Sequence, residues 1–280
     1  MKTRNAMQLK AFIKQLAMEL NIRPQQMLHT YYMECFVNRL AHSDYVDRFI
    51  LKGGYLISNL IGFEARTTMD VDATLKNFPM DQTVMTKALA HICNIPADDD
   101  FTFSLDHLEQ IREKDEYQGF RAFINLNYEV MRGQLTMDIT TGDSIYPDVQ
   151  QSFFKRCFDQ SLIKAWAYPI ETVLAEKLET IVTRGVFNTR PREYYDVYML
   201  TKSVDFDIPT LRHALLATAE HRKTKDVITQ ESSQRIKEIE QSIGVRHQWE
   251  NYCAIFNYAK GISFETVVHA VQNLLGKAIA

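Results

Sequence analysis

The chain has 280 residues and a formal net charge of −3, with 46% hydrophobic and 24% charged residues. These values are typical of a globular protein with one large domain or two modest ones. The small net charge excludes a global electrostatic signal for nucleic acid or membranes, so any polyanionic partner would need a local basic patch.

The cysteines and histidines argue against a zinc site. No two histidines have metal-ligand spacing on a helix, and the cysteines are far apart, which favours free thiols in a reducing compartment. The opening residues predict a mixed polar and apolar helix rather than a signal peptide, and no transmembrane run follows. We therefore expect a cytoplasmic protein. The four cysteines are Cys35, Cys93, Cys157 and Cys253.

Apolar spacing predicts a helix over residues 6–20 and a second helix that begins at Pro24. A short apolar strand over residues 49–51 then leads through a Gly-Gly turn into an apolar helix over residues 55–61. The next strand, residues 69–75, carries two aspartates. The chain in this part therefore runs from helices into a strand–turn–helix–strand unit.

The two aspartates of that strand, Asp70 and Asp72, point to the same face because alternate side chains of a strand do so. Gly53 and Gly54 let the backbone approach a ligand, and the helix behind them offers N–H groups and a positive dipole end to phosphate. Metal-assisted nucleotidyl transfer needs this combination, and oxygen ligands suit Mg²⁺. An isolated Asp-x-Asp is more often the solvated face of a strand, but the Gly-Gly turn and residues 66–68 favour a site.

Residues 81–93 predict a helix, and the acidic run of residues 98–100 predicts a solvated turn rather than a metal site. From residue 101 to residue 141 the pattern has period two, with strands over residues 120–130 and 134–141 and a turn over residues 131–133.

Asp138 lies between Met137 and Ile139 on the second of these strands. It is our candidate for a third metal ligand on a strand beside that of the two aspartates, although an exposed edge-strand aspartate fits the sequence equally well. Asp143, in the following turn, is the lesser candidate.

We expect connecting material over residues 147–160 and a helical half from Ser161 onward. Its first strong helix begins at Pro169 and ends at Gly185. Lys177 lies in the apolar stripe of that helix, where a lysine either serves a phosphate or extends its ammonium group out to solvent.

The next helix carries Arg192 and Asp196, which are four residues apart and could simply form an ion pair on the helix surface. Arg184, Arg190 and Arg192 form a basic stretch that could meet a triphosphate or an RNA backbone. Four further helices are expected beyond residue 200. The basic run of residues 221–225 is either a solvated connection or a nucleic-acid contact.

Lys52-Gly53-Gly54 followed by Arg66-x-Thr68-x-Asp70-x-Asp72 resembles the first motif of the AbiEii/AbiGii-type toxins. These are nucleotidyltransferase-fold proteins of bacterial toxin–antitoxin and phage abortive-infection systems. The resemblance extends over about residues 25–200. It implies that a third acid lies on a strand such as that of Asp138, and that the helix lysine at position 177 contributes to the nucleotide site. It also implies that Arg192-Glu193 replaces the usual Lys-Asp pair of the last motif, whose later aspartate is Asp196.

The resemblance implies an α+β fold: a nucleotidyltransferase (DNA polymerase β-like) core with a mixed sheet and flanking N-terminal helices over residues 1–160, and a helical domain over residues 161–280 that completes the nucleotide site. The implied substrate is an NTP. The implied acceptor is RNA such as tRNA, and the implied partner is an antitoxin from a neighbouring gene. The implied metal ligands for one or two Mg²⁺ ions are Asp70, Asp72 and Asp138. The implied catalytic residues are Asp70, Asp72, Lys177 and Asp196, and the implied nucleotide-binding residues are Lys52, Gly53, Gly54, Arg66, Thr68 and Arg192.

Two alternatives of other classes stay open. A small-molecule nucleotidyltransferase of the antibiotic-modifying kind would share the first motif but would have a pocket that saturates with a drug-like acceptor. A nucleotide-binding regulator would keep the Gly-Gly turn and bind NTP without releasing pyrophosphate. Neither a serine hydrolase nor a P-loop NTPase is supported, because both signature motifs are missing from the sequence.

Overall fold

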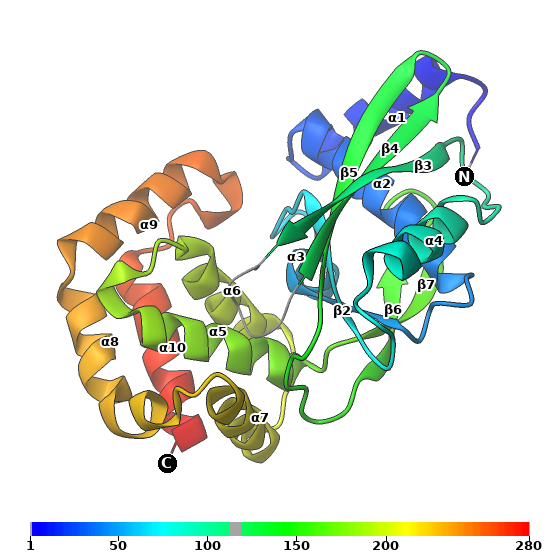
Figure 1. Ribbon diagram of the computed structural model, residues 1–280. Helices are drawn as coiled ribbons and strands as arrows, with labels where there is room; N and C mark the ends of the chain where they lie inside the picture. The colour runs from blue at the N-terminus through cyan, green and yellow to red at the C-terminus, as the bar shows by residue number, and fades with distance from the viewer. Residues whose placement is uncertain (1, 112–118, 280) are drawn as a thin grey trace. The chain divides into compact units, whose positions relative to one another are not determined.

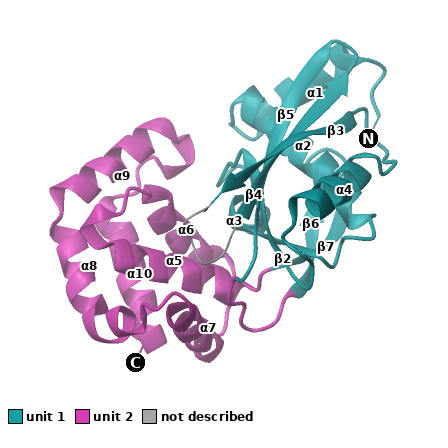
Figure 2. Ribbon diagram, in the orientation of Figure 1, with its two compact units in different colours: residues 1–142, 150–167 teal, residues 143–149, 168–280 magenta. Residues whose placement is uncertain are grey.

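The computed structural model describes residues 2–111 and 119–279. Its chain divides into two compact units, which Figure 2 distinguishes by colour. The first unit comprises residues 1–142 and 150–167, and the second comprises residues 143–149 and 168–280.

The predicted boundary at Ser161 needs correction, because it falls inside a β-hairpin. Strands β6 (Gln150–Lys155) and β7 (Leu162–Ala167) pair antiparallel within the first unit. The prediction of connecting material over residues 147–160 misses β6, because a strand of only six residues is too short for a clear alternation. The helical unit therefore begins after β7.

The first unit contains one mixed sheet, which confirms the predicted α+β class (Figure 1). In the described part of the chain its strand order is β3-β4-β5-β2-β1-β7-β6. The β2–β5 and β1–β7 pairs are parallel and the other neighbours are antiparallel. The remaining strands are β1 (Phe49–Lys52), β2 (Asp70–Leu75), β3 (Thr102–Ile111), β4 (Gly119–Tyr128) and β5 (Met131–Thr140).

The two faces of this sheet differ in polarity. One face is apolar and packs on helices: Phe36 of α2 contacts Phe103 of β3, and Tyr55 of α3 stacks on Phe154 of β6. The other face, called here the open face, carries polar side chains around Asp70 and keeps many of them partly exposed. The helices of this unit are α1 (Ala6–Glu19), α2 (Pro24–Ala41), α3 (Gly53–Ile61) and α4 (Gln82–Cys93).

Two local predictions were wrong. The turn between β4 and β5 lies at Glu129 and Val130, where Glu129 has φ of 49°, and not at residues 131–133. The acidic run of residues 98–100 is not fully solvated, because Asp99 is buried and accepts hydrogen bonds from both terminal nitrogens of Arg39. A lone charge cannot be buried cheaply, so Arg39 compensates for the burial of Asp99.

The second unit is helical, as predicted. Helix α5 buries the expected stripe, and Gly185 (φ 53°) ends it. No helix in the described residues is both long and apolar enough to cross a membrane. The α-helices are α5 (Ile170–Arg184), α6 (Pro191–Ser203), α7 (Ile208–His221), α8 (Ser232–Gln241), α9 (Ile243–Ile255) and α10 (Phe264–Ile279). Short turns of other helix types are η1 (Gly185–Phe187), η2 (Val227–Glu231) and η3 (Asn257–Ala259).

A fully buried carboxyl group lies between α2 and the end of β6. Glu34 Oε1 accepts a hydrogen bond from the Cys157 N–H at 2.8 Å, while Oε2 has no partner among the described residues. Burial raises the pKa of Glu34 to about 7, although the Cys157 hydrogen bonds and Arg156 oppose that rise. The native fold therefore favours the protonated form of this side chain.

We predict that the stability of the native protein contains a pH-dependent contribution from Glu34. It is fully present below the ordinary pKa of 4.5 and is lost as pH rises through about 7. The full loss corresponds to about 3 kcal/mol. Glu34→Gln keeps an acceptor for Cys157 and should remove this loss, which urea unfolding at acidic and alkaline pH would measure. The exposed control Glu19→Gln should follow wild type, and identical pH profiles for Glu34→Gln and wild type would contradict the assignment.

Candidate functional site

Three carboxylates lie on the open face, on neighbouring strands. Asp72 of β2 pairs in register with Asp138 of β5, so their side chains share a face, and Asp70 lies two residues before Asp72 on the same face. The predicted placement of Asp138 beside the Asp-x-Asp strand is therefore confirmed. Asp70 is exposed, and Asp72 and Asp138 are half-buried.

The Gly-Gly turn packs directly against Asp72. The Gly54 N–H donates a hydrogen bond to Asp72 Oδ2 at 3.1 Å. Gly53 has φ of +61°, and a Cβ atom there would lie 2.1 Å from Asp72 Oδ2. A Cβ atom on Gly54 would lie 2.4 Å from the Thr68 hydroxyl oxygen. Both positions therefore favour glycine strongly, and the Gly54 N–H at the start of α3 lies beside a carboxylate.

Arg66 and Thr68 are buried behind this turn. The Arg66 guanidinium donates to the carbonyl oxygen of Gly54 at 3.2 Å and to that of Thr67 at 3.4 Å. These contacts support a role in shaping the Gly-Gly turn. The predicted contact of Arg66 and Thr68 with nucleotide stays a prediction.

Lys52 precedes the turn and pairs in register with Asp72. Its ammonium group donates to the Thr140 hydroxyl at 2.8 Å. Burial raises the pKa of Asp72, and the negative charges of Asp138 and Asp70 raise it further, while the Gly54 N–H and the charge of Lys52 lower it. The site is therefore a group of repelling carboxylates that a nearby cation stabilises.

Three side chains that sequence analysis did not single out contact or approach these carboxylates. Arg121 of β4 binds Asp138 through two hydrogen bonds of 2.7 and 2.8 Å, and the Thr136 hydroxyl donates to Asp70. His29 of α2 lies close enough for the charge of Asp70 to raise its pKa, although burial lowers that pKa more. The period-two alternation in β4 and β5 could have indicated Arg121 and Thr136, because it places both on the polar face of their strands.

The metal ligands are predicted from the oxygen donors that these aspartates offer, and not from side chains already grouped around one position. Among residues 2–111 and 119–279, no group of three or more His, Cys, Asp or Glu side chains is placed to hold a metal ion. Asp138 is instead held by Arg121. Its role as a third metal ligand stays a prediction.

In the second unit, Lys177 does not extend to solvent but is held between two carboxylates. Its Nζ lies 2.7 Å from Glu193 Oε2 and 2.8 Å from Asp196 Oδ2, and the Asp196 side chain is fully buried. The helices α5 and α6 thus bring together the predicted lysine and the predicted aspartate. Arg192 lies over the Phe256 ring at 5.3 Å. The catalytic roles of Lys177, Asp196 and Arg192 stay predictions.

Two lesser candidates also have structural partners in the second unit. Asp143 accepts a hydrogen bond from the Tyr168 hydroxyl at 2.7 Å. In the basic run of residues 221–225, Arg222 forms ion pairs with Glu176 and Glu179 of α5. This arginine is therefore part of the helix packing.

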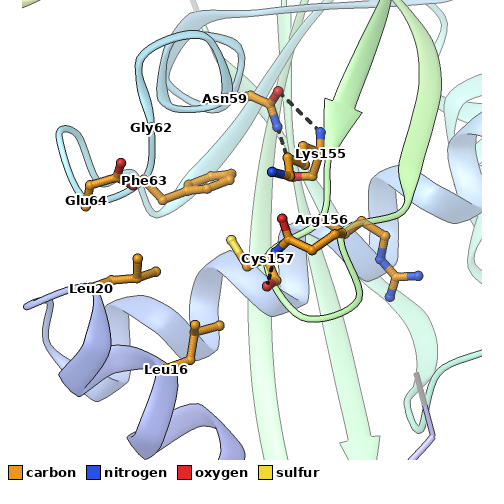
Figure 3. A pocket seen from close by; sticks show the side chains of 10 residues that line it. Leu16, Leu20, Asn59, Gly62, Phe63, Glu64, Lys155, Arg156 and Cys157 are labelled. Atoms are coloured by element: carbon orange, nitrogen blue, oxygen red, sulfur yellow. Dashed lines mark hydrogen bonds between the residues drawn. The ribbon is translucent and has the colours of Figure 1, made fainter.

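A cavity of about 320 Å³ lies elsewhere in the first unit, between the end of α1, the end of α3 and the end of β6. In Figure 3, Leu16, Leu20, Phe63 and Cys157 surround it. None of the predicted site residues lines this cavity. Burial raises the pKa of the Cys157 thiol far above its ordinary value, so this thiol is not an activated nucleophile.

A family model described as the nucleotidyl transferase AbiEii toxin of a type IV toxin–antitoxin system matches residues 35–270. The chain belongs to the AbiEii family. The match extends well past residue 200, where the motif resemblance ends. The family model therefore includes most of the helical second unit. The motif that carries Asp70 and Asp72 and the helices that carry Lys177 and Asp196 all lie within the matched range.

Two solved structures are similar to this chain at low sequence identity. JHP933 from Helicobacter pylori is 14% identical with a TM-score of 0.50, and the alignment covers 91% of this chain and 93% of that one. An H. pylori protein described as a candidate nucleotidyltransferase is 13% identical with a TM-score of 0.49, over 92% of this chain and 97% of that one. A comparison with curated protein sequences finds no match.

We predict that Gly53→Ala and Gly54→Ala each destabilise the AbiEii protein by at least about 1–2 kcal/mol. The φ of Gly53 is strained for alanine, and both Cβ atoms would collide with neighbouring side chains. Thermal unfolding would measure the loss. Gly276→Ala in α10 is the matched control, because a Cβ there meets no atom within 4 Å, and it should stabilise by about 0.5–1 kcal/mol. Unchanged stability of Gly53→Ala would contradict the close packing on Asp72.

We also predict that Lys177→Met destabilises the protein by about 3–5 kcal/mol, because it leaves the buried Asp196 carboxylate without its cation. Adding Asp196→Asn should restore much of the lost stability, and urea unfolding of the single and double variants would show this. If Lys177→Met alone were as stable as wild type, the ion pair would not support the packing of α5 and α6.

Proposed function

We propose that this AbiEii protein is a metal-dependent nucleotidyltransferase that transfers NMP from an NTP to an acceptor and releases pyrophosphate. The single observation that carries the proposal is the packing of the Gly-Gly turn onto the Asp-x-Asp strand. It joins the start of α3, which favours phosphate, to a carboxylate that favours a cation. Family membership supports the same reaction class.

The side chains of the open face fit a bound Mg²⁺ ion. Asp70 and Asp72 offer oxygen donors on one face, and Asp70 and Asp138 act on Asp72 as like charges. These two aspartates would hold the ion, with Asp138 as a further donor after release from Arg121. Bound there, Mg²⁺ would neutralise charge on the triphosphate. The glycine turn would hold the phosphates, and Lys52 would add positive charge beside them.

In the proposed reaction an acceptor hydroxyl oxygen attacks the α-phosphorus of the NTP. The bond from the α-phosphorus to the bridging oxygen breaks, and pyrophosphate leaves with the electron pair. The hydroxyl proton passes to solvent. Positioning and electrostatic stabilisation supply most of the catalysis in such transfers.

The biological setting of the proposal follows from the AbiEii family. We propose an RNA acceptor such as tRNA, action in the bacterial cytoplasm, and an antitoxin from a neighbouring gene that opposes the toxin. A role in phage defence is part of the same proposal. Lys177 and Asp196 are kept as proposed contributors to nucleotide use.

A labelling experiment tests the proposal. Purified protein is incubated with Mg²⁺, total cellular RNA and each α-³²P-labelled NTP in turn. We expect one or more labelled NTPs to mark a tRNA-sized band. Asp70→Asn and Asp72→Asn should each lower the rate by several orders of magnitude while circular dichroism shows an unchanged fold. Asp98→Asn, before β3, is the control at an acid of the first unit whose side chain is 81% exposed, and it should stay within a few-fold of wild type.

Normal transfer by both Asp70→Asn and Asp72→Asn would refute the assigned carboxylates. Pyrophosphate release without labelled RNA would instead point to a small-molecule or protein acceptor. Binding of NTP with no pyrophosphate release under any condition would favour the regulator alternative.

A further inference from the structure

The residues of the open face form rows that cross the sheet from β3 to β2. One row runs from Glu109 through Arg121 and Asp138 to Asp72. The neighbouring row runs from His107 through Phe123 and Thr136 to Asp70. Side chains of one row stand side by side, because register partners point to the same face. The second row therefore places two aromatic rings in line with a proposed catalytic carboxylate.

A β-bulge brings the first of these rings to the open face. The pairing of β3 with β4 shifts between Leu105 and His107. Without that shift the residue opposite Phe123 would be Asp106, and His107 would point to the apolar face. Bulges often re-aim side chains next to functional sites. Here the bulge builds an aromatic pair on a face that is otherwise polar.

The two rings of this pair are stacked. The centroids of His107 and Phe123 are 4.3 Å apart and their planes differ by 8°. Asp106 and Glu109 contact the two ring nitrogens of His107 at 3.1 and 3.4 Å and fix the plane of the imidazole. The His107 side chain is 49% exposed. The Phe123 side chain is half-buried, so the pair is partly open on the sheet surface and available for a further ring.

The second face of Phe123 is directed along the row toward Asp70. The side chain between them is the small Thr136, whose hydroxyl binds Asp70. Two strand spacings separate Phe123 from Asp70, which is about 10 Å. A planar base stacked on Phe123 above Thr136 would thus lie beside the proposed catalytic carboxylate.

The position of the Gly-Gly turn indicates whether the stacked base belongs to the donor NTP or to the acceptor. The turn follows β1, on one side of β2, whereas Phe123 lies on β4, on the other side. In-line transfer places the attacking and leaving oxygens on opposite sides of the α-phosphorus. If the leaving pyrophosphate lies at the turn, the acceptor approaches from the β5–β4 side. The aromatic pair is then on the acceptor's path.

Arg121 adds a cation to that path. Its Nε and Nη2 are held by Asp138, and its Nη1 makes no hydrogen bond to any described residue. Farther along the same face, Asn125 and Gln134 bind each other through their amides at 3.1 Å. Cationic and amide groups around a partly exposed aromatic pair suit a single-stranded nucleic acid better than an apolar protein segment.

We propose that His107 and Phe123 form a stacking platform for a nucleobase at the unpaired end of a polynucleotide acceptor. This inference rests on the proposed function, because it uses the proposed place of the pyrophosphate. His107 stiffens the platform from behind, Phe123 carries the base, and Arg121 binds a neighbouring phosphate of the acceptor.

The test measures transfer from the labelled NTP to a tRNA pool by the full-length protein, at varied RNA and varied NTP. Phe123→Ala should raise KM for RNA about 5- to 100-fold, in line with the stacking of one base, and leave KM for NTP within about two-fold. His107→Ala should shift KM for RNA in the same direction by less. Phe123→Tyr should stay close to wild type, because it keeps the ring.

Phe153→Ala is the matched control, since Phe153 is an exposed phenylalanine of β6 at the opposite edge of the sheet. It should leave both KM values unchanged. Circular dichroism melting would check each fold, and if Phe123→Ala does not fold, the exposed His107→Ala decides the test.

Three outcomes would overturn the platform. An unchanged KM for RNA in folded Phe123→Ala would refute the stacking platform. A rise in KM for NTP alone would assign the rings to the donor base. Failure of wild type to label RNA would exclude a polynucleotide acceptor. NTP binding and pyrophosphate release, compared between wild type and Asp72→Asn, decide the proposed function separately from all three.

Discussion

The site depends on the close contact between the Gly-Gly turn and Asp72. The Gly54 N–H binds this carboxylate at 3.1 Å, and there is no room for a Cβ atom on Gly53. This contact fixes the start of α3 against the end of β1 and against β2, so a phosphate-favouring helix end and a cation-favouring carboxylate occupy one place. Arg66 is buried behind the turn and holds its carbonyl oxygen, which makes the motif a packed unit.

The two faces of the sheet carry different kinds of side chain. Val71, Ala73, Met137 and other buried apolar residues pack on helices, while the alternate positions carry the carboxylates and the side chains that bind them. In the second unit, the charged site residues form ion pairs with one another. There Lys177 is held within 3 Å of both Glu193 and Asp196, and these ion pairs join α5 to α6. In each unit, residues that look catalytic in the sequence also stabilise the local structure.

The strand–turn–helix–strand motif could be predicted because it is local: period-two alternation, two glycines and an Asp-x-Asp lie within a short stretch. The predicted placement of Asp138 beside Asp72 is also confirmed, but its neighbours fit an exposed edge strand equally well, and the family resemblance decided between the two. Partners such as Arg121, His29 and Thr136 could not be assigned, because they depend on register between strands and on helix packing. The β6–β7 hairpin was missed because its strands are short, and the bulge at Asp106 shifts the alternation that would have revealed His107.

The central claim is that the carboxylates beside the Gly-Gly turn receive a metal-bound nucleotide. Crystals of the protein grown with Mn²⁺ and a non-hydrolysable NTP analogue test it most directly, because anomalous scattering locates the metal independently of any activity. We predict a manganese peak at the carboxylates of Asp70 and Asp72, with the triphosphate against Gly53 and Gly54. A bound triphosphate elsewhere, or a manganese peak away from both aspartates, would contradict it.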